Sequence, residues 1–156
     1  MMVDVFESVR NRRFPALHLF VISTAFLGSM LTGCGKATTD KDIVVISATD
    51  VLALRDRLKE SPKAVELIDP RPAARFEEGH IPGAKNINLP AVPPDAKLDR
   101  AMQDFEMLVV YGENPASPSA RAMTKRLISV GYPDVRFMAG GLEEWREKGG
   151  EIVTGH

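Results

Sequence analysis

An apolar run of five residues, Met107-Leu108-Val109-Val110-Tyr111, constrains the fold of this chain more than any other feature. Nearly every position in it is apolar, as in a parallel strand that is buried on both faces of a sheet. Similar short runs lie on either side, separated by stretches with the apolar spacing of helices. The alternation predicts a three-layer α/β fold, in which helices cover both faces of a central, parallel, five-stranded sheet.

The other strands are expected at 43–46, 65–68, 84–89 and 135–138, with the first of them buried. Thr49 or Asp50 is expected to cap the helix that follows the first strand. Ser117 provides a capping hydroxyl for another helix, with Pro118 in its first turn. The remaining helical segments are expected from Pro72 to Gly79, around 97–105, and over 142–148.

The first 34 residues differ in composition from the rest of the chain. Three arginines (residues 10, 12 and 13) precede an apolar run from Phe14 to Leu31, and small residues follow it. A basic region, an apolar region and a small-residue exit indicate an export signal. The sequence Leu31-Thr32-Gly33-Cys34 resembles the lipobox of bacterial lipoproteins. The resemblance implies cleavage of a signal peptide at residues 1–33 and acylation of Cys34.

Two other interpretations of this segment remain open. The apolar run is just long enough to stay as a membrane anchor, and Cys34 could be an ordinary thiol. Either membrane interpretation predicts an exported protein attached to the cell membrane or outer membrane, with its domain facing the periplasm or the cell exterior. In the lipoprotein interpretation, residues 34–42 are the lipidated cysteine and a polar tether. The root-mean-square end-to-end distance of such a tether is roughly 16 Å.

Charge and residue counts exclude several classes of function. The 156 residues carry 20 basic and 21 acidic side chains, so the basic surface required for nucleic-acid binding is not expected. Without residues 1–34, 17 basic and 19 acidic side chains remain, so no polybasic patch for anionic lipid is expected. A single cysteine excludes an internal disulfide, and His18, His80 and His156 are too scattered for a metal site. No cofactor or metal is predicted.

Three motifs resemble those of rhodanese-like domains in their order and spacing. The first is Asp69-Pro70-Arg71 with Gly79-His80-Ile81-Pro82-Gly83-Ala84, and the second is Val109-Val110-Tyr111 with Ser119-Ala120-Arg121-Ala122. The third is Gly140-Gly141 with Trp145. The resemblance implies a rhodanese-like fold over residues 43–150, which leaves 151–156 as a C-terminal tail.

Most residues of these motifs have a structural interpretation. Asp69 and Arg71 are expected to hydrogen-bond the turns at the carboxyl edge of the sheet. Gly79 and Gly83 are expected to allow backbone conformations that a Cβ would penalise. His80 either orders its loop or contacts a ligand, the first being favoured. Gly140-Gly141 is expected to form a tight turn, and Trp145 to anchor the last helix.

The resemblance also raises a question about catalysis. Rhodaneses transfer sulfane sulfur through a cysteine directly after the central strand, whose thiolate is cradled by backbone amides of the loop and the next helix. Here the corresponding residue is Gly112, or Glu113 if the alignment is fixed on Ser119. Neither side chain can form a persulfide, so no catalytic residue is predicted.

The loop after the central strand nevertheless remains a candidate ligand site. The amide cradle is expected to persist without the thiol and to accept an anion, which Glu113 would repel unless it points to solvent. Arg121 either pairs with such an anion or is solvated, the second being favoured. The candidate residues are Gly112, Glu113, Asn114, Ser117, Ser119 and Arg121.

The predicted function is that of a membrane-anchored, non-catalytic rhodanese-like domain that binds or regulates a partner. An envelope protein, a small oxyanion or a sulfur species are the partner classes considered, besides the membrane itself. The alternative is a sulfurtransferase or sulfur-species carrier with an unconventional site. Phosphatase or arsenate-reductase chemistry, which the superfamily also hosts, needs the same loop cysteine and is disfavoured.

Overall fold

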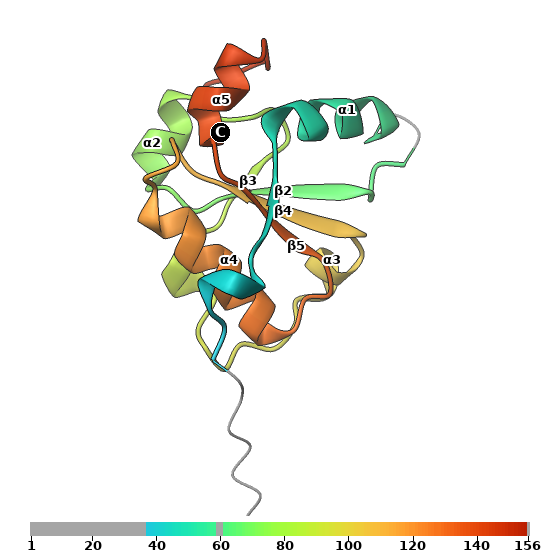
Figure 1. The fold of residues 1–156 in the computed structure, drawn as a ribbon, viewed down its shortest axis with the longest axis vertical. Coiled ribbons are helices and arrows are strands. Elements are labelled where there is room, and N and C mark those ends of the chain that lie inside the picture. Colours follow the sequence, from blue (N-terminus) through green and yellow to red (C-terminus); the bar gives the residue numbers. More distant parts are fainter. Residues whose placement is uncertain (1–36, 59–60, 156) are drawn as a thin grey trace, which may run out of the picture. The chain divides into compact units, whose positions relative to one another are not determined.

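Five parallel strands form one sheet with the order β1-β5-β4-β2-β3 (Figure 1). The structure is a computed structural model and describes residues 37–58 and 61–155. The predicted signal peptide (residues 1–33), Cys34 and His156 lie outside the described residues. The strands are β1 (Val44–Ile46), β2 (Val65–Asp69), β3 (Lys85–Asn86), β4 (Met107–Tyr111) and β5 (Val135–Met138). The α-helices are α1 (Ala48–Leu58), α2 (Ala73–Glu78), α3 (Arg100–Gln103), α4 (Pro118–Val130) and α5 (Gly141–Glu147).

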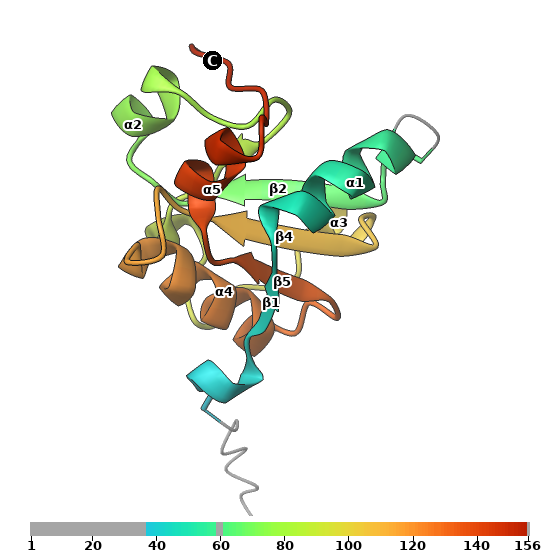
Figure 2. The same cartoon turned by 45° about the horizontal axis from the view of Figure 1, so that its top comes forward.

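The sheet is covered on both faces, as the strand–helix alternation predicts. Alternate residues of β4 point to opposite faces, so Val109 and Tyr111 belong to one apolar core and Leu108 and Val110 to the other. Apolar residues of α1 and α5 complete the first core, and those of α3 and α4 complete the second. Figure 2 shows α1 and α5 on one side of the strands and α4 on the other. The predicted three-layer α/β fold is confirmed.

The first strand is less buried than its composition suggests. Val44 and Val45 are 54% and 62% exposed, and only Ile46 of β1 is buried. Val44 and Val45 are exposed because β1 is an edge strand that pairs with β5 alone. The third predicted strand is likewise reduced to the two residues of β3 at the opposite edge.

The N-terminal cap of α1 lies earlier than predicted. The Ser47 hydroxyl accepts a hydrogen bond from Asp50 N at 3.1 Å, and the Asp50 carboxylate accepts from the Ser47 hydroxyl at 2.6 Å. Ser47 and Asp50 therefore form a reciprocal cap, with Asp50 inside the first turn rather than before it. Thr49 is a residue of the helix itself.

Part of the segment predicted as a tether is folded onto the domain. Residues Asp40–Asp42 form a short 3₁₀-helix with a capping box between Thr39 and Asp42. The Asp40 carboxylate pairs with Lys125 Nζ of α4 at 2.9 Å, and the hydroxyls of Thr38 and Ser129 are hydrogen-bonded. From Thr38 onward the chain is therefore attached to α4, and the predicted polar tether is shorter than the sequence suggests.

The predicted C-terminal tail is also part of the fold. Val153 pairs with His80 in an antiparallel bridge, with backbone N–O distances of 2.9 and 3.0 Å. The carbonyl of Glu151 accepts a hydrogen bond from the Trp145 indole nitrogen at 2.8 Å. Ile152 Cγ2 lies 3.0 Å from the position of a Cβ on Gly79. Gly79 has an extended backbone, so the prediction of a conformation that a Cβ would penalise is wrong there, and the close approach of Ile152 favours glycine instead. At Gly83 the positive φ of 81° confirms that prediction.

Among residues 37–58 and 61–155, no helix combines the length and the apolar character needed to cross a bilayer.

Candidate functional site

The loop that joins β4 to α4, residues 112–117, is fixed in place by the first turn of α5. Backbone amides of Leu142 and Glu143 donate to the carbonyls of Gly112 and Glu113, each at 2.9 Å. Gly141 has φ = 61°, and a Cβ there would lie 2.5 Å from the Gly112 carbonyl oxygen. Glycine at 141 therefore satisfies both a left-handed backbone and the close approach of the loop. Gly140 has an ordinary helical φ of −68°.

The Ser117 side chain fills the centre of this loop. Its hydroxyl oxygen accepts hydrogen bonds from the backbone amides of Glu113 at 2.9 Å and Asn114 at 3.1 Å. The prediction that this hydroxyl caps α4 is wrong, because it makes no capping hydrogen bond to the helix. Two amides of the predicted anion cradle are thus satisfied from within the chain.

Ser117 also occupies the space beside Gly112. A Cβ added to Gly112 would lie 2.4 Å from Ser117 Cβ and 2.7 Å from its hydroxyl oxygen. Ala120 Cβ would be 3.1 Å away. No side chain can therefore project from position 112 unless Ser117 moves. Glycine at 112 and serine at 117 are complementary in volume.

Asn114 closes the loop on itself. Its side-chain oxygen accepts from Ala116 N at 3.1 Å, and its carbonyl accepts from Ser117 N at 3.0 Å. Pro115 and Pro118 have no amide hydrogen to offer a ligand. The loop is consequently a compact turn, and its polar groups largely hydrogen-bond to one another.

Asp69 and Arg71 form a buried ion pair beneath this loop. Arg71 Nη2 and Nε donate to the Asp69 carboxylate at 2.7 and 3.0 Å, and Nη2 also donates to the Gly79 carbonyl at 2.7 Å. The two side chains are 7% and 0% exposed. Burial lowers the pKa of Arg71, but Asp69 and Glu113 outweigh this effect and raise it, so the guanidinium stays charged. These contacts match the structural role predicted for the pair.

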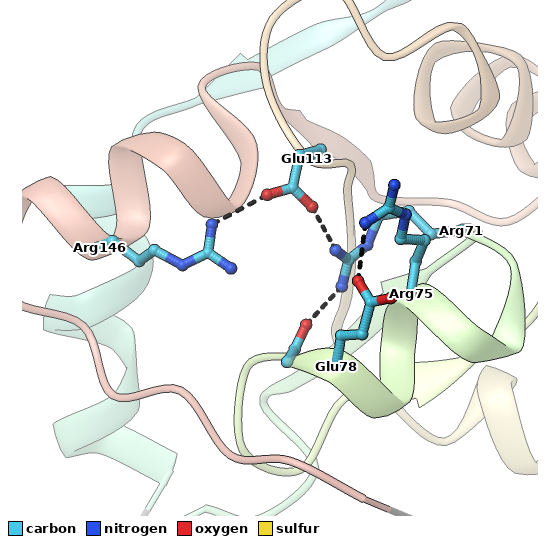
Figure 3. Close-up of a pocket in the computed structure, with 6 residues that line it drawn as sticks. Arg71, Arg75, Glu78, Glu113 and Arg146 are labelled. Atoms are coloured by element: carbon cyan, nitrogen blue, oxygen red, sulfur yellow. Dashed lines mark hydrogen bonds and ion pairs between the residues drawn. The ribbon is translucent and has the colours of Figure 1, made fainter.

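Glu113 bridges two arginines from different elements (Figure 3). One carboxylate oxygen pairs with Arg71 Nη1, and the other accepts from Arg146 Nη1 of α5 at 2.9 Å. Burial raises the pKa of Glu113, whereas Arg146 and Arg71 together lower it by a larger amount, so the net shift is downward. The carboxylate thus points neither to free solvent nor into the amide cradle, but between two cations.

A pocket of about 560 Å³ opens over this bridge. Its rim includes an exposed ion pair between Arg75 Nη1 and the Glu78 carboxylate at 2.7 Å (Figure 3). Each guanidinium around the pocket faces a carboxylate of the same chain. The lining residues are Arg71, Arg75, Glu78, Gly79, Glu113 and Arg146.

Tyr111 and His80 connect the site to the core. Burial, and secondarily the Asp69 carboxylate, raises the pKa of Tyr111, so its hydroxyl stays protonated. The Tyr111 hydroxyl oxygen accepts a hydrogen bond from Ile81 N at 3.3 Å. His80 is buried, stacks on the Phe76 ring with centroids 3.7 Å apart, and its Nδ1 lies 2.8 Å from the Phe76 carbonyl oxygen. These are contacts that order the loop around residues 79–83.

Several predicted site residues lie away from the pocket. The Arg121 guanidinium lies over the Phe137 ring, 5.1 Å from its centroid, and is not among the lining residues. Ser119 is a half-buried residue of the first turn of α4, and Trp145 is fully buried under α5. Within residues 37–58 and 61–155, the structure contains no cluster of three or more metal-ligating side chains.

Sequence reasoning missed Arg75, Glu78 and Arg146. Each belongs to a short helix in which charged side chains are common on the solvent face, so nothing local distinguishes them. Only the packing of α2 and α5 beside the loop brings them to one pocket.

The fold and motifs define an α/β domain with its site at the end of the central strand, and comparison with known proteins assigns the class. The family model for the rhodanese-like domain matches residues 47–148. The chain belongs to the rhodanese-like domain family. This family assignment confirms the resemblance seen in the three motifs.

Relatives extend the comparison. The chain is 34% identical over 128 residues to the adenylyltransferase and sulfurtransferase UBA4 of Candida albicans, covering 74% of this chain and 27% of that protein. It therefore spans about a quarter of that relative's length. It is 35% identical over 94 residues to the thiosulfate sulfurtransferase GlpE of Pseudomonas putida, covering 60% of this chain and 78% of GlpE.

A solved structure agrees with the fold. The solution structure of the rhodanese-like domain of the Alr3790 protein from Anabaena sp. is similar, with a TM-score of 0.52 and 26% identity. The similarity covers 70% of this chain and 78% of that one.

Proposed function

We propose that this chain is a membrane-anchored rhodanese-like domain that binds or regulates a partner and does not transfer sulfur. The observation that carries the proposal is the pairing of Gly112 with Ser117. The family resemblance implies a nucleophilic cysteine at position 112, or at 113 if the alignment is fixed on Ser119. Gly112 bears no side chain and Ser117 fills the adjoining space, while Glu113 bears a carboxylate that cannot form a persulfide. A persulfide needs a thiol, and the sole cysteine of the chain is Cys34.

The loop amides support the same conclusion. In a catalytic loop of this kind, free N–H groups stabilise a thiolate or an incoming anion. Here the amides of Glu113 and Asn114 already donate to the Ser117 hydroxyl. An anion could bind to these two amides only after the Ser117 hydroxyl had moved away from them. In the present arrangement they are not free donors.

A sulfur-transfer assay tests the absence of activity. The full chain, purified in detergent, is incubated with thiosulfate and cyanide, and thiocyanate is measured. We expect no turnover above that of a Cys34→Ser variant or of an unrelated protein. Turnover in the Cys34→Ser variant would show that the domain itself transfers sulfur and would overturn the proposal.

The alternative is an unconventional sulfurtransferase or sulfur-species carrier, and the names of the relatives favour it. UBA4 and GlpE are both named as sulfurtransferases. Mass spectrometry of the Cys34→Ser chain after exposure to thiosulfate or polysulfide distinguishes the two. Added sulfur, or saturable binding that a replaced 112–117 loop abolishes, would favour the alternative.

The membrane anchor is a separate part of the proposal. It is supported by the sequence Leu31-Thr32-Gly33-Cys34 after the apolar run. Three acyl chains would attach the protein stably, since one chain alone binds a bilayer only marginally. Mass spectrometry of the protein purified from cell envelopes is expected to find an acylated Cys34 at the amino terminus. An unmodified thiol there would exclude the lipoprotein interpretation.

A further inference from the structure

The bridge made by Glu113 has the geometry of a bound ligand. Its carboxylate supplies one oxygen to Arg71 and the other to Arg146, two lining side chains that lie on either side of it (Figure 3). Carboxylates held between guanidinium groups form charge-assisted hydrogen bonds that are stronger than neutral ones. The pocket therefore already demonstrates, with a group of its own chain, which chemical group its two arginines accept.

Glu113 is placed so that it can leave. Its side chain is 45% exposed and comes from the loop, whereas Arg71 is buried and fixed by Asp69. When Glu113 rotates away, the Arg71 and Arg146 guanidinium groups remain in the pocket and only the carboxylate between them departs. Arg146 is as exposed as Glu113, at 48%, so Arg71 is the fixed member of the two guanidinium groups.

The charge balance specifies the ligand. Arg71 is neutralised by Asp69, Arg75 by Glu78, and Arg146 by Glu113. Without the Glu113 carboxylate, these groups would have a net charge of one positive unit. A group with one negative charge restores the balance, whereas a dianion such as thiosulfate or sulfate exceeds it.

We propose that Glu113 is an internal stand-in ligand, and that the Arg71–Arg146 clamp binds the carboxylate of an external ligand that displaces it. This inference rests on the proposed function, since it identifies the chemistry that the binding module recognises. A carboxylate of this kind is carried by small organic acids, by the C-terminus of a peptide, or by an acidic side chain. The pocket volume of about 560 Å³ has room for groups beyond the carboxylate itself.

Competition by Glu113 sets the expected effect. A ligand that binds only when the clamp is open has its apparent affinity reduced by the fraction of molecules in the open state. Replacing Glu113 with alanine removes the competitor. We expect the Kd of the full chain for acetate to fall by about tenfold or more in Glu113→Ala.

The source of the carboxylate is distinguished by three probes, measured by calorimetric titration of the full chain in detergent. They are acetate, acetyl-Gly-Gly with a free C-terminus, and acetyl-Gly-Glu-amide. Tighter binding of one peptide than of acetate identifies a C-terminal or side-chain carboxylate, respectively. Equal binding of all three identifies a small-acid site.

Matched variants test whether the gain in acetate affinity comes from the Arg71–Arg146 clamp or from the loss of any negative charge. Asp104→Ala removes an exposed carboxylate that pairs with Lys63 and does not line the pocket, and should leave acetate binding unchanged. Adding Arg146→Gln to Glu113→Ala should abolish the gain. Glu113→Gln, which preserves the shape of the side chain while removing its charge, provides a second test if the alanine variant does not fold.

The clamp is refuted if neither Glu113 variant gains affinity, if Asp104→Ala gains as much, or if sulfate binds Glu113→Ala as tightly as acetate. These outcomes are independent of sulfur transfer. Thiocyanate production by Cys34→Ser would overturn the proposed non-catalytic function while leaving the binding result to stand or fall by itself.

Discussion

Gly112 and Ser117 share one small volume at the end of the central strand: a Cβ on Gly112 would lie 2.4 Å from the Ser117 Cβ. The relationship means that the loop is built around the absence of a side chain at 112. A side chain at 112 therefore requires either a smaller residue at 117 or a movement of Ser117.

Gly112→Cys by itself is expected to destabilise the protein by about 1–3 kcal/mol, as overpacked substitutions do. Ser117→Gly removes the clashing atoms together with the hydroxyl, so it should cost less in the Gly112→Cys background than in wild type. Urea denaturation measures both effects. Gly112→Cys with Ser119→Gly is the matched control, since Ser119 does not contact the added Cβ at these distances. A cost of Ser117→Gly that is equal in the two backgrounds, as is expected for Ser119→Gly, would contradict the shared-volume explanation.

Ser117→Ala is expected to lower the free energy of unfolding by about 1–3 kcal/mol, because two loop amides lose their acceptor. Hydrogen exchange should accelerate at the amides of Glu113 and Asn114. Ser119→Ala, two residues further on, should have a smaller effect. If the two alanine variants prove equally stable, the Ser117 hydroxyl does not hold the loop.

Asp69→Asn is expected to cost about 3–5 kcal/mol, because it leaves the buried Arg71 guanidinium without its main counter-charge. Asp104→Asn breaks an ion pair with Lys63 in which both side chains are more than half exposed, and should cost no more than about 1 kcal/mol. Thermal or urea denaturation compares the two. Similar losses in both variants would show that burial of Asp69 and Arg71 does not govern the cost.

The lowered pKa of Glu113 predicts a pH dependence. A depressed carboxyl pKa stabilises the native state above the unfolded value of about 4.3, and this stabilisation is lost as the pH falls through the native value. Wild type should therefore be more stable than Glu113→Gln at pH 7, with the difference shrinking as the pH falls below about 4.3. Glu78→Gln, at an exposed pair, should differ little from wild type at pH 7. A difference for Glu113→Gln that stays constant down to pH 3 would contradict the ion bridge.

The fold was largely predictable because its determinants are local. The apolar run at 107–111 has the composition of a buried parallel strand, and the helices between strands showed their apolar spacing. One error came at the sheet edge, where Val44 and Val45 have the composition of core residues but β1 has a neighbour on one side only. Strand order depends on how distant segments pack, which local composition does not encode.

For the site, the amino-acid sequence by itself determined which residue types follow the central strand: a glycine at 112, a glutamate at 113 and no cysteine. Tertiary structure alone decided that Ser117 turns back into the loop and that Glu113 meets Arg71 and Arg146, residues 42 and 33 positions away. The physical reason is that hydrogen bonds and ion pairs depend on distances of about 3 Å between atoms. Such distances between remote residues exist only after the sheet has brought α2, α5 and the loop together.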